Sequence, residues 1–445
     1  MHDLRKQALL ESGKTVSRKA RSKTASPMTS RPASRANSRP AASRTNSRNV
    51  SDDEGELSDT TQWSTHSIDE LIAEAVDSDL PQEAWIDDLN ERIHDILDRK
   101  RSSVQGREET LQGFNLDLTR HYAMEELKPR MEELLPAVLK SVKGGATERE
   151  TVLALKGLAL MLITVPSESV YDTISDPIKS TISDADHPHA KLAAIHALSI
   201  VTFYGGASVG ETEAVLDFLL EIISSDGASV NEEDHADIVE AALQEWGFLA
   251  TQLEDLEDIT EPAMEAFVEQ LESSDVGVQI AAGDNIALLY EKSYTEVEED
   301  EVVAEEEVET NGSDEHMVKR YTVYRQQHQL EQLLEDLAKA SSKRVSKKDR
   351  KALHLTFSDI LNTVEKPTRG PRYSTALDKD NGVELGSRLK IRVHDGGRLT
   401  IDKWWMWHRM NGLKRLLQGG FLVHFERNEV VSDSLPGDVE RNDYK

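Results

Sequence analysis

Apolar side chains recur at helical spacing almost without a break from about residue 68 to residue 293. Four segments in this span share one arrangement: alanine or glycine lines one side of a helix, and leucine, isoleucine or aromatic residues occupy positions i, i+3, i+4 and i+7. The segments are VLALKGLALMLITV from Val152, KLAAIHALSIVTF from Lys191, IVEAALQEWGFLATQL from Ile238 and QIAAGDNIALLYE from Gln279, with a weaker copy, TLQGFNLDLTRHY, from Thr110. We therefore predict a set of related helices in this part of the chain.

The related segments recur with a regular period. Their centres, Ala154, Ala194, Ala242 and Ala282, are about 40 to 48 residues apart, which is the range of HEAT and armadillo repeats. Shorter amphipathic helices such as ETEAVLDFLLEIISS lie between them, and breakers such as KGGATERE separate the two kinds. The pattern predicts an all-α domain over residues 61–295, a HEAT/armadillo-like α-solenoid whose surface binds partner proteins.

Two other segments lack apolar periodicity. Residues 1–60 are rich in arginine and serine, so we expect a disordered basic tail. An arginine precedes Ser34, Ser38 and Ser47 by three positions, a spacing that suits basophilic kinases, with a merely solvated tail as the alternative. Residues 296–316 carry many acids and no lysine or arginine, so we expect a disordered acidic insertion there.

Helical spacing returns after the acidic insertion. Residues 317–366 are predicted to form a helical basic segment, and residues 367–430 a small α+β C-terminal unit, followed by a flexible tail at 431–445. In the C-terminal unit, SRLKIRV and RLTI flank HDGG, which signals a hairpin. DKWWMWHRMNGLKRLL predicts a helix with Asp402 as its N-cap and Gly419-Gly420 at its end, and FLVHFER predicts a last short strand.

The composition and motifs argue against an enzyme. The chain contains no cysteine, which excludes disulfides, cysteine-based zinc sites and thiol nucleophiles. SGKT near Ser12 lacks the full phosphate-binding loop, and DHPHAK places Asp186, His187 and His189 in a turn, where a capping or solvated role is favoured over metal binding. We expect no catalytic residues, cofactor, metal or small-molecule substrate.

The distribution of apolar residues also bears on where in the cell the protein is found. No apolar run approaches the ~20 residues needed to cross a bilayer, and no apolar segment follows the basic N-terminus as in a secretory signal. We expect a cytoplasmic or nuclear protein, or one present in both compartments, with no membrane partner.

A dense basic segment contrasts with the formal net charge of −30. Six of the nine residues from Lys343 to Lys351 are cationic, and Asp349 is their only acid. Cationic helices bind phosphate backbones largely without sequence preference. Because a chain of this charge repels phosphate as a whole, its basic charge has to be concentrated locally. On a helix, the apolar stripe that follows comprises Leu353, Phe357, Ile360, Leu361 and Val364.

These observations define a set of candidate RNA-contacting residues: Lys343, Arg344, Lys347, Lys348, Arg350, Lys351, Lys403, Arg409, Lys414 and Arg415. Three alternatives stay open for the basic segment, namely nuclear import, pairing with the acids of residues 296–309, and a solvated face. Aromatic residues beside lysine and arginine in WWMWHRMNGLKRLL suit stacking on single-stranded RNA. Met406, Met410, Leu413 and Leu417 share one helix face, however, and we expect that face to pack on the hairpin.

The helical span, the basic SKKDRKALHLTFSDIL and the closing LKIRV and RLTIDKWWMWHRMNGLKRLLQGGFLVHF together resemble the interferon-related developmental regulator family. The resemblance covers about residues 60 to 430, although WWMW is richer in tryptophan than the family pattern. The matching positions of the last unit are Ile401, Asp402, Trp404, Asn411, Leu413, Lys414, Gly420 and Phe421. The resemblance implies a regulator of gene expression without known catalytic activity.

The resemblance implies one of two functions, at the ribosome or in the nucleus, and leaves both open. The first is a non-enzymatic regulator that engages the ribosome or its RNA through the basic segment, while the solenoid holds protein partners. The second is a nuclear transcriptional co-regulator, a scaffold that recruits chromatin-modifying complexes and uses the basic segment for import.

Overall fold

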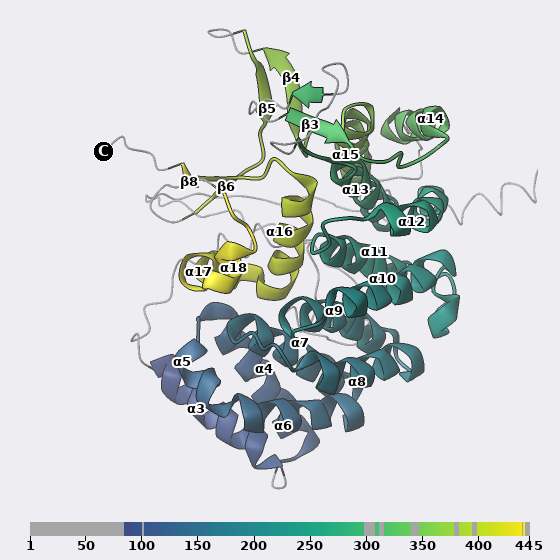
Figure 1. The fold of residues 1–445 in the computed structure, drawn as a ribbon. Helices are drawn as coiled ribbons and strands as arrows, with labels where there is room; N and C mark the ends of the chain where they lie inside the picture. Colours follow the sequence, from purple (N-terminus) through teal and green to yellow (C-terminus); the bar gives the residue numbers. More distant parts are fainter. Residues whose placement is uncertain are drawn as a thin grey trace, which may run out of the picture. The chain divides into compact units, whose positions relative to one another are not determined.

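The computed structural model of the chain describes residues 84–99, 102–297, 308–310, 316–339, 347–377, 382–393, 398–437 and 439–440 (Figure 1). The predicted basic tail, with Ser34, Ser38 and Ser47, lies outside the described residues, as does most of the acidic insertion. Lys343 and Arg344 of the basic segment also lie outside them. Among the described helices, none is both long enough and apolar enough to cross a membrane.

Helices fill the chain from Ala84 to Lys292, and the described part of this span contains no strand. The prediction of a helical domain is therefore confirmed from Ala84 to Lys292. In chain order the helices are α3 (Ala84–Leu97), α4 (Val104–Arg120), α5 (Met124–Leu127), α6 (Met131–Gly144), α7 (Glu148–Thr164), α8 (Tyr171–Asp184), α9 (Pro188–Tyr204), α10 (Val209–Ser224), α11 (Ala236–Ala250), α12 (Glu257–Gln270) and α13 (Val276–Lys292), with 3-10 turns at Lys128–Arg130 and Ala228–Val230.

The alanine-rich segments of the sequence form one layer, which we call the inner layer. Within it α4 packs on α7, α7 on α9, α9 on α11 and α11 on α13, while α6, α8, α10 and α12 pack on these helices from the other layer (Figure 1). The centres Ala154, Ala194, Ala242 and Ala282 are fully buried. Small side chains at these positions allow the close approach of helices that the sequence predicts.

Polar side chains in the breaker segments set where several helices begin. Thr147 accepts a hydrogen bond from a backbone N–H at the start of α7, and Asp275 accepts two at the start of α13. At α10, Ser208 and Glu211 bond reciprocally to each other's backbone N–H. These bonds satisfy donors that a helix leaves unpaired in its first turn, so the breakers fix the register of each new helix.

A small antiparallel sheet follows α13. Its strands are β1 (Tyr294–Glu296), β2 (Val308–Thr310) and β3 (His316–Lys319), with β3 in the centre. The prediction of an unfolded acidic insertion is therefore wrong at Glu296, at residues 308–310 and at His316. Val308 lies opposite Val318 in the ladder, and the backbone hydrogen bonds of the sheet outweigh the local excess of acids.

Two helices and two hairpins come next. The helices α14 (Gln327–Lys339) and α15 (Lys347–Glu365) pack on each other, and α15 also packs on α13. Strand β4 (Tyr373–Leu377) pairs with β5 (Glu384–Ser387), and β6 (Lys390–Arg392) pairs with β7 (Arg398–Thr400). The second pairing confirms the hairpin predicted around HDGG, and β8 (Val439–Glu440) adds to its β7 edge.

The last helices are α16 (Trp404–Leu417), α17 (Phe421–Arg427) and α18 (Glu429–Asp433). The prediction of a strand at FLVHFER is wrong, because this segment is α17. Its buried and aromatic residues also fit a helix: Phe421 and His424 are buried, and the rings of Phe421 and Phe425 stack 6.1 Å apart, one helical turn along the chain.

The C-terminal helices lie along the inner layer. Helix α16 packs on α11, α13, α7 and α4, and α18 packs on α7. The sequence predicted instead that α16 would pack on the hairpin, a prediction that the contacts with the inner layer correct. Figure 1 shows α16, α17 and α18 beside these helices.

Candidate nucleic-acid interface

Helix α15 joins the basic segment to the protein core. It begins at Lys347, inside the basic run, and continues through the predicted apolar stripe. Leu353, Phe357, Ile360 and Val364 are at most 3% exposed, and Leu361 is half-buried. The apolar part of the helix thus anchors it against α13 and α14, and its first turn carries the basic residues.

Close contact between α13 and α15 depends on a glycine. A Cβ atom added at Gly283 of α13 would lie 2.5 Å from Ile360 Cδ1 and 3.1 Å from Phe357 Cε1. Both distances are shorter than van der Waals contact allows without movement of the neighbours. Gly283 therefore brings α15 against the inner layer and fixes the position of its basic end.

The start of α15 is electrostatically unfavourable on its own. The positive end of a helix dipole lies at its N-terminus, where acids stabilise a helix and bases do not. Three of the first four residues, Lys347, Lys348 and Arg350, are nevertheless cationic. Arg350 is half-buried and Lys351 is exposed. Charge repulsion at this helix end is relieved when an anion binds there.

Arg415 lies inside the protein. Its Nη2 atom is 2.7 Å from Glu245 Oε1, and the two side chains are 5% and 3% exposed. His196 Nδ1 lies 2.6 Å from the same oxygen, and Ser199 donates to Oε2. Burial alone would raise the pKa of Glu245, but Arg415 and these donors hold it at about 2. In this conformation Arg415 contacts a buried carboxylate and cannot reach a phosphate backbone.

The other C-terminal candidates are also in contact with the protein. Arg409 donates to Thr251 Oγ1 at 2.9 Å, and its guanidinium lies over the rings of Phe203 and Trp405 at 5.2 and 4.9 Å. Lys414 is half-buried, with Nζ 5.8 Å from the centre of the Phe421 ring. Lys403 is half-buried immediately before α16. Arg409 therefore holds α16 on the inner layer, and the structure does not bring these cations together with those of α15.

The N-terminus of α16 is capped from a distant helix. The predicted cap, Asp402, is exposed, and Lys403 at the cap position makes no side-chain capping bond. Instead Glu291 of α13 accepts hydrogen bonds from the backbone N–H groups of Trp404 at 2.6 Å and Trp405 at 3.0 Å. Burial raises the pKa of Glu291 to about 7, against the lowering effect of these two bonds. The prediction of Asp402 as the N-cap is therefore wrong.

The tryptophan side chains of WWMW make contacts within the protein. Trp404 is buried and donates from Nε1 to Thr363 Oγ1 at 2.9 Å. Trp407 is half-buried and donates to Asp284 Oδ2, also at 2.9 Å. Burial raises the pKa of Asp284 to about 7, although the bond from Trp407 opposes this shift. In this conformation the rings pack in the core rather than forming a surface on which bases could stack.

Further polar bonds fix the C-terminal segment along the inner layer. His424 Nε2 donates to the carbonyl of Leu118 at 2.9 Å, and Asn428 Nδ2 donates to that of Ile163 at the same distance. Lys156 Nζ donates to Gln418 Oε1 at 3.1 Å. These partners lie on α4 and α7, so the segment from α16 to α18 bonds along much of the length of the inner layer.

Sequence reasoning missed one group of cations. Arg388, Lys390, Arg392 and Arg398 are exposed on or beside the β6–β7 hairpin. A signal was present in the sequence, because basic and apolar residues alternate strictly in RLKIRV, the pattern of a strand with one solvent face. The hairpin was predicted from this segment, but its charged face was not.

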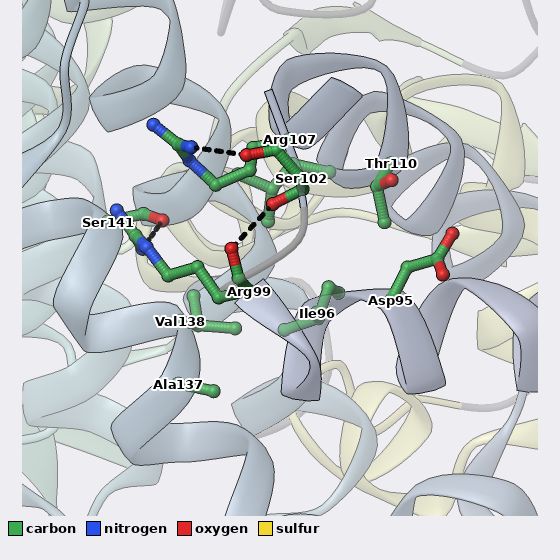
Figure 2. Close-up of a pocket in the computed structure, with 10 residues that line it drawn as sticks. Asp95, Ile96, Arg99, Ser102, Arg107, Thr110, Ala137, Val138 and Ser141 are labelled. Atoms are coloured by element: carbon green, nitrogen blue, oxygen red, sulfur yellow. Dashed lines mark hydrogen bonds between the residues drawn. The ribbon is translucent and has the colours of Figure 1, made fainter. Parts of the chain in front are cut away.

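A cavity near the first helices is structural in character. It lies between α3, α4 and α6, and Ile96, Thr110 and Val138 are among the residues that line it (Figure 2). At its edge Arg99 Nη2 and Arg107 Nε each lie 2.9 Å from an oxygen of Glu150, which is fully buried. Although burial opposes it, hydrogen bonding from Arg107 and its neighbours lowers the pKa of Glu150. The arginines are engaged by this carboxylate, so the group joins helices rather than awaiting a ligand.

The histidine pair in DHPHAK lies at the start of α9. His187 precedes the helix without a side-chain capping bond, and His189 Nδ1 lies 3.1 Å from Glu148 Oε1. Within the described ranges, no three histidine, aspartate or glutamate side chains are grouped so that they could hold a metal ion. This segment therefore supplies no candidate site.

Comparison with known proteins gives one family. A family model described as interferon-related developmental regulator matches residues 49–365, which include α3 to α15 and the basic segment. A protein of Schizosaccharomyces pombe that carries no functional name is 30% identical over 352 residues, covering 78% of this chain and 73% of its own length.

Two relatives with functional names are more distant. Mouse interferon-related developmental regulator 2 is 24% identical over 376 residues, covering 82% of this chain and 75% of its own length. Human interferon-related developmental regulator 1 is 22% identical over 399 residues, covering 86% of this chain and 78% of its own length. The similarity to these proteins thus extends over most of both chains.

Proposed function

Because the chain belongs to the interferon-related developmental regulator family, we propose that it is a non-catalytic regulator of gene expression that acts at the ribosome or its RNA. The contact is made by the basic segment Lys343–Lys351. The bound group is the phosphate backbone, since closely spaced lysine and arginine side chains neutralise phosphates without reading bases.

One observation carries this proposal: a single helix has a buried apolar part and a basic first turn. Phe357 and Ile360 of α15 are fully buried against the core, so the helix is held firmly. Lys351 is exposed at the other end, next to the three cations of the first turn. A basic run that served only to keep the chain solvated would not need a fixed helix behind it.

We also infer that the two layers of helices form an α-solenoid of the HEAT/armadillo type. Support comes from the period of the alanine centres and from the contacts of each inner helix with the next. The C-terminal helices already lie on the inner layer, which leaves α6, α8, α10 and α12 for partner proteins. The scaffold function, which relies on a free concave surface, has less support for that reason.

Sedimentation tests the proposed function. Tagged full-length protein is run on a sucrose gradient before and after ribonuclease treatment, beside a variant with Lys347, Lys348, Arg350 and Lys351 replaced by glutamine. The parent is expected in the ribosomal fractions and to leave them after ribonuclease, whereas the variant stays at the top.

A matched control removes the same charge elsewhere. Arg120, Lys128, Lys140 and Lys143 are exposed on the first helices, and their replacement by glutamine is expected to leave sedimentation unchanged. If the basic-segment variant sediments with ribosomes as the parent does but fails to enter the nucleus, the segment is an import signal. The ribosomal proposal would then be abandoned in favour of the nuclear co-regulator.

A further inference from the structure

The β6–β7 hairpin has one apolar face and one cationic face. In the register of the pair, Ile391 lies opposite Leu399, and Leu399 is fully buried. Lys390, Arg392 and Arg398 are exposed, with Arg392 directly opposite Arg398. Residues directly opposite each other, and residues two apart on one strand, share a face of the sheet. The three cations therefore lie on the same solvent-exposed face.

This face is electrostatically unfavourable by itself. Like charges directly opposite each other in an antiparallel pair destabilise the pair. The chain has 82 acids, yet no ion pair among the described side chains includes Arg388, Arg392 or Arg398. Strand β8 brings the backbone of Glu440 opposite Arg398, on the far side from Arg392. A cationic face in so acidic a chain requires an explanation beyond solubility.

A backbone hydrogen bond connects Arg388, just before β6, to Arg372, just before β4. The backbone N–H of Arg388 donates to the carbonyl of Arg372 at 3.3 Å, which brings these two exposed residues together. Arg372 forms an ion pair with Asp359 of α15 at 3.5 Å, with 44% of its own side chain still exposed. The hairpin is thus connected at Arg388 to a residue that pairs with α15.

We infer that Arg388, Lys390, Arg392 and Arg398 form a second contact surface for the phosphate backbone of a nucleic acid, an inference that rests on the proposed function of α15. Guanidinium groups bind phosphate oxygens through paired hydrogen bonds. Cations two residues apart on a strand are about 6.6–6.8 Å apart, a spacing that a phosphate backbone can follow. The segments of β6 and β7 contain no aromatic residue, so contact is made without base stacking.

The two basic surfaces are associated with different parts of α15. The basic segment occupies its first turn, whereas Trp404, which follows β7 closely, bonds to Thr363 near its last turn. The helix has 19 residues and is therefore about 28 Å long. A nucleic acid that is longer than the helix is therefore long enough to contact both surfaces.

Fluorescence anisotropy with a labelled RNA hairpin tests the inference on the full chain. The stem is chosen longer than α15, and Kd is measured as a function of salt concentration. A sheet variant replaces Arg388, Lys390, Arg392 and Arg398 by glutamine, and the comparison proteins are the α15 variant and the matched control of the previous section. We expect the sheet variant to bind about tenfold more weakly or worse at low salt. The slope of log Kd against the logarithm of the salt concentration should fall by about one unit for each lost phosphate contact.

The outcomes separate the two proposals. If the parent fails to bind the hairpin, the proposed function and the second surface both fail. If the α15 variant loses affinity while the sheet variant binds like the parent and the matched control, only the second surface is overturned. If the sheet variant keeps its RNA affinity but loses binding to vesicles of anionic phospholipid, the face recognises lipid headgroups and the nucleic-acid assignment is wrong. Circular dichroism of each variant, unchanged from the parent, excludes unfolding as the cause.

Discussion

Arg415 and Glu245 form a buried ion pair across 170 positions of the chain. The arginine belongs to α16 and the glutamate to α11, so the pair connects the C-terminal segment to the middle of the inner layer. Each buried charge depends on the other, because an unpaired charge inside a protein retains its desolvation cost without compensation.

Replacing Arg415 by methionine should lower the free energy of unfolding by roughly 3–5 kcal/mol, since Glu245 would remain buried without its cation. Urea denaturation followed by circular dichroism measures the change. The exposed Lys140→Met serves as the control and should unfold near the parent's midpoint. Equal midpoints for the two variants would contradict the role assigned to the pair.

Asp284 should make stability depend on pH. Burial raises its pKa from 3.8 to about 7, so the folded state binds this proton more tightly than the unfolded state does. The stability contributed by the protonated form is complete below pH ~4, falls as the pH rises toward 7 and stays low above that. Asp284→Asn keeps an acceptor for Trp407 and removes the charge. The variant should therefore gain Tm over the parent at pH 8 and little at pH 4, and an equal difference at both values would rule this out.

Phe357 should be required for stability, whereas the cations of α15 should not. Phe357 is fully buried against Gly283, so Phe357→Ala should lower the free energy of unfolding by about 3–5 kcal/mol. Replacing the four cations Lys347, Lys348, Arg350 and Lys351 by glutamine should leave thermal unfolding almost unchanged, because no described ion pair includes Arg350 or Lys351 and charges outside the core contribute little to stability. A scanning calorimeter distinguishes these results, and a large loss of Tm in the four-glutamine variant would show that the cations are structural.

Glu291 should stabilise the first turn of α16. Glu291→Ala removes the acceptor for the N–H groups of Trp404 and Trp405, which should cost about 1–2 kcal/mol, the usual effect of losing a helix cap. Hydrogen exchange at these two amides should become faster. Glu291→Gln retains one acceptor oxygen and should fall between alanine and the parent. Unchanged exchange in the alanine variant would mean that another group caps the helix.

Local patterns in the sequence predict the helices and the buried apolar side of α15, but not the packing of the C-terminal helices on the inner layer. Alanine spacing and breaker residues act within one or two turns, so the inner layer can be predicted from them. The bonds from His424 to Leu118 and from Asn428 to Ile163 join residues 306 and 265 positions apart, and nothing local specifies them. Asp402 failed as a cap for the same reason, because the acceptor that replaces it, Glu291, lies on a different helix.

Ambiguous periodicity explains why FLVHFER was wrongly predicted to form a strand. In FLVHFER the apolar residues Phe421, Val423 and Phe425 alternate as in a strand, while Phe421 and Phe425 are also one helical turn apart. In so short a segment the choice depends on tertiary surroundings, here the buried positions of Phe421 and His424 beside α4 and α16. The cationic face of β6–β7 was predictable in principle, since it requires only that the charges of a correctly predicted hairpin be assigned to one side.

The placement of the C-terminal helices on the inner layer has a consequence for synthesis of the chain. At about 5–20 residues per second, the 306 positions between Leu118 and His424 correspond to roughly 15 to 60 seconds of translation. Throughout that interval the earliest helices have emerged without the segment that completes their hydrogen bonds. The nascent protein therefore has a prolonged period in which its first half presents unfinished surface to chaperones, and it reaches its final structure only after the last helices leave the exit tunnel.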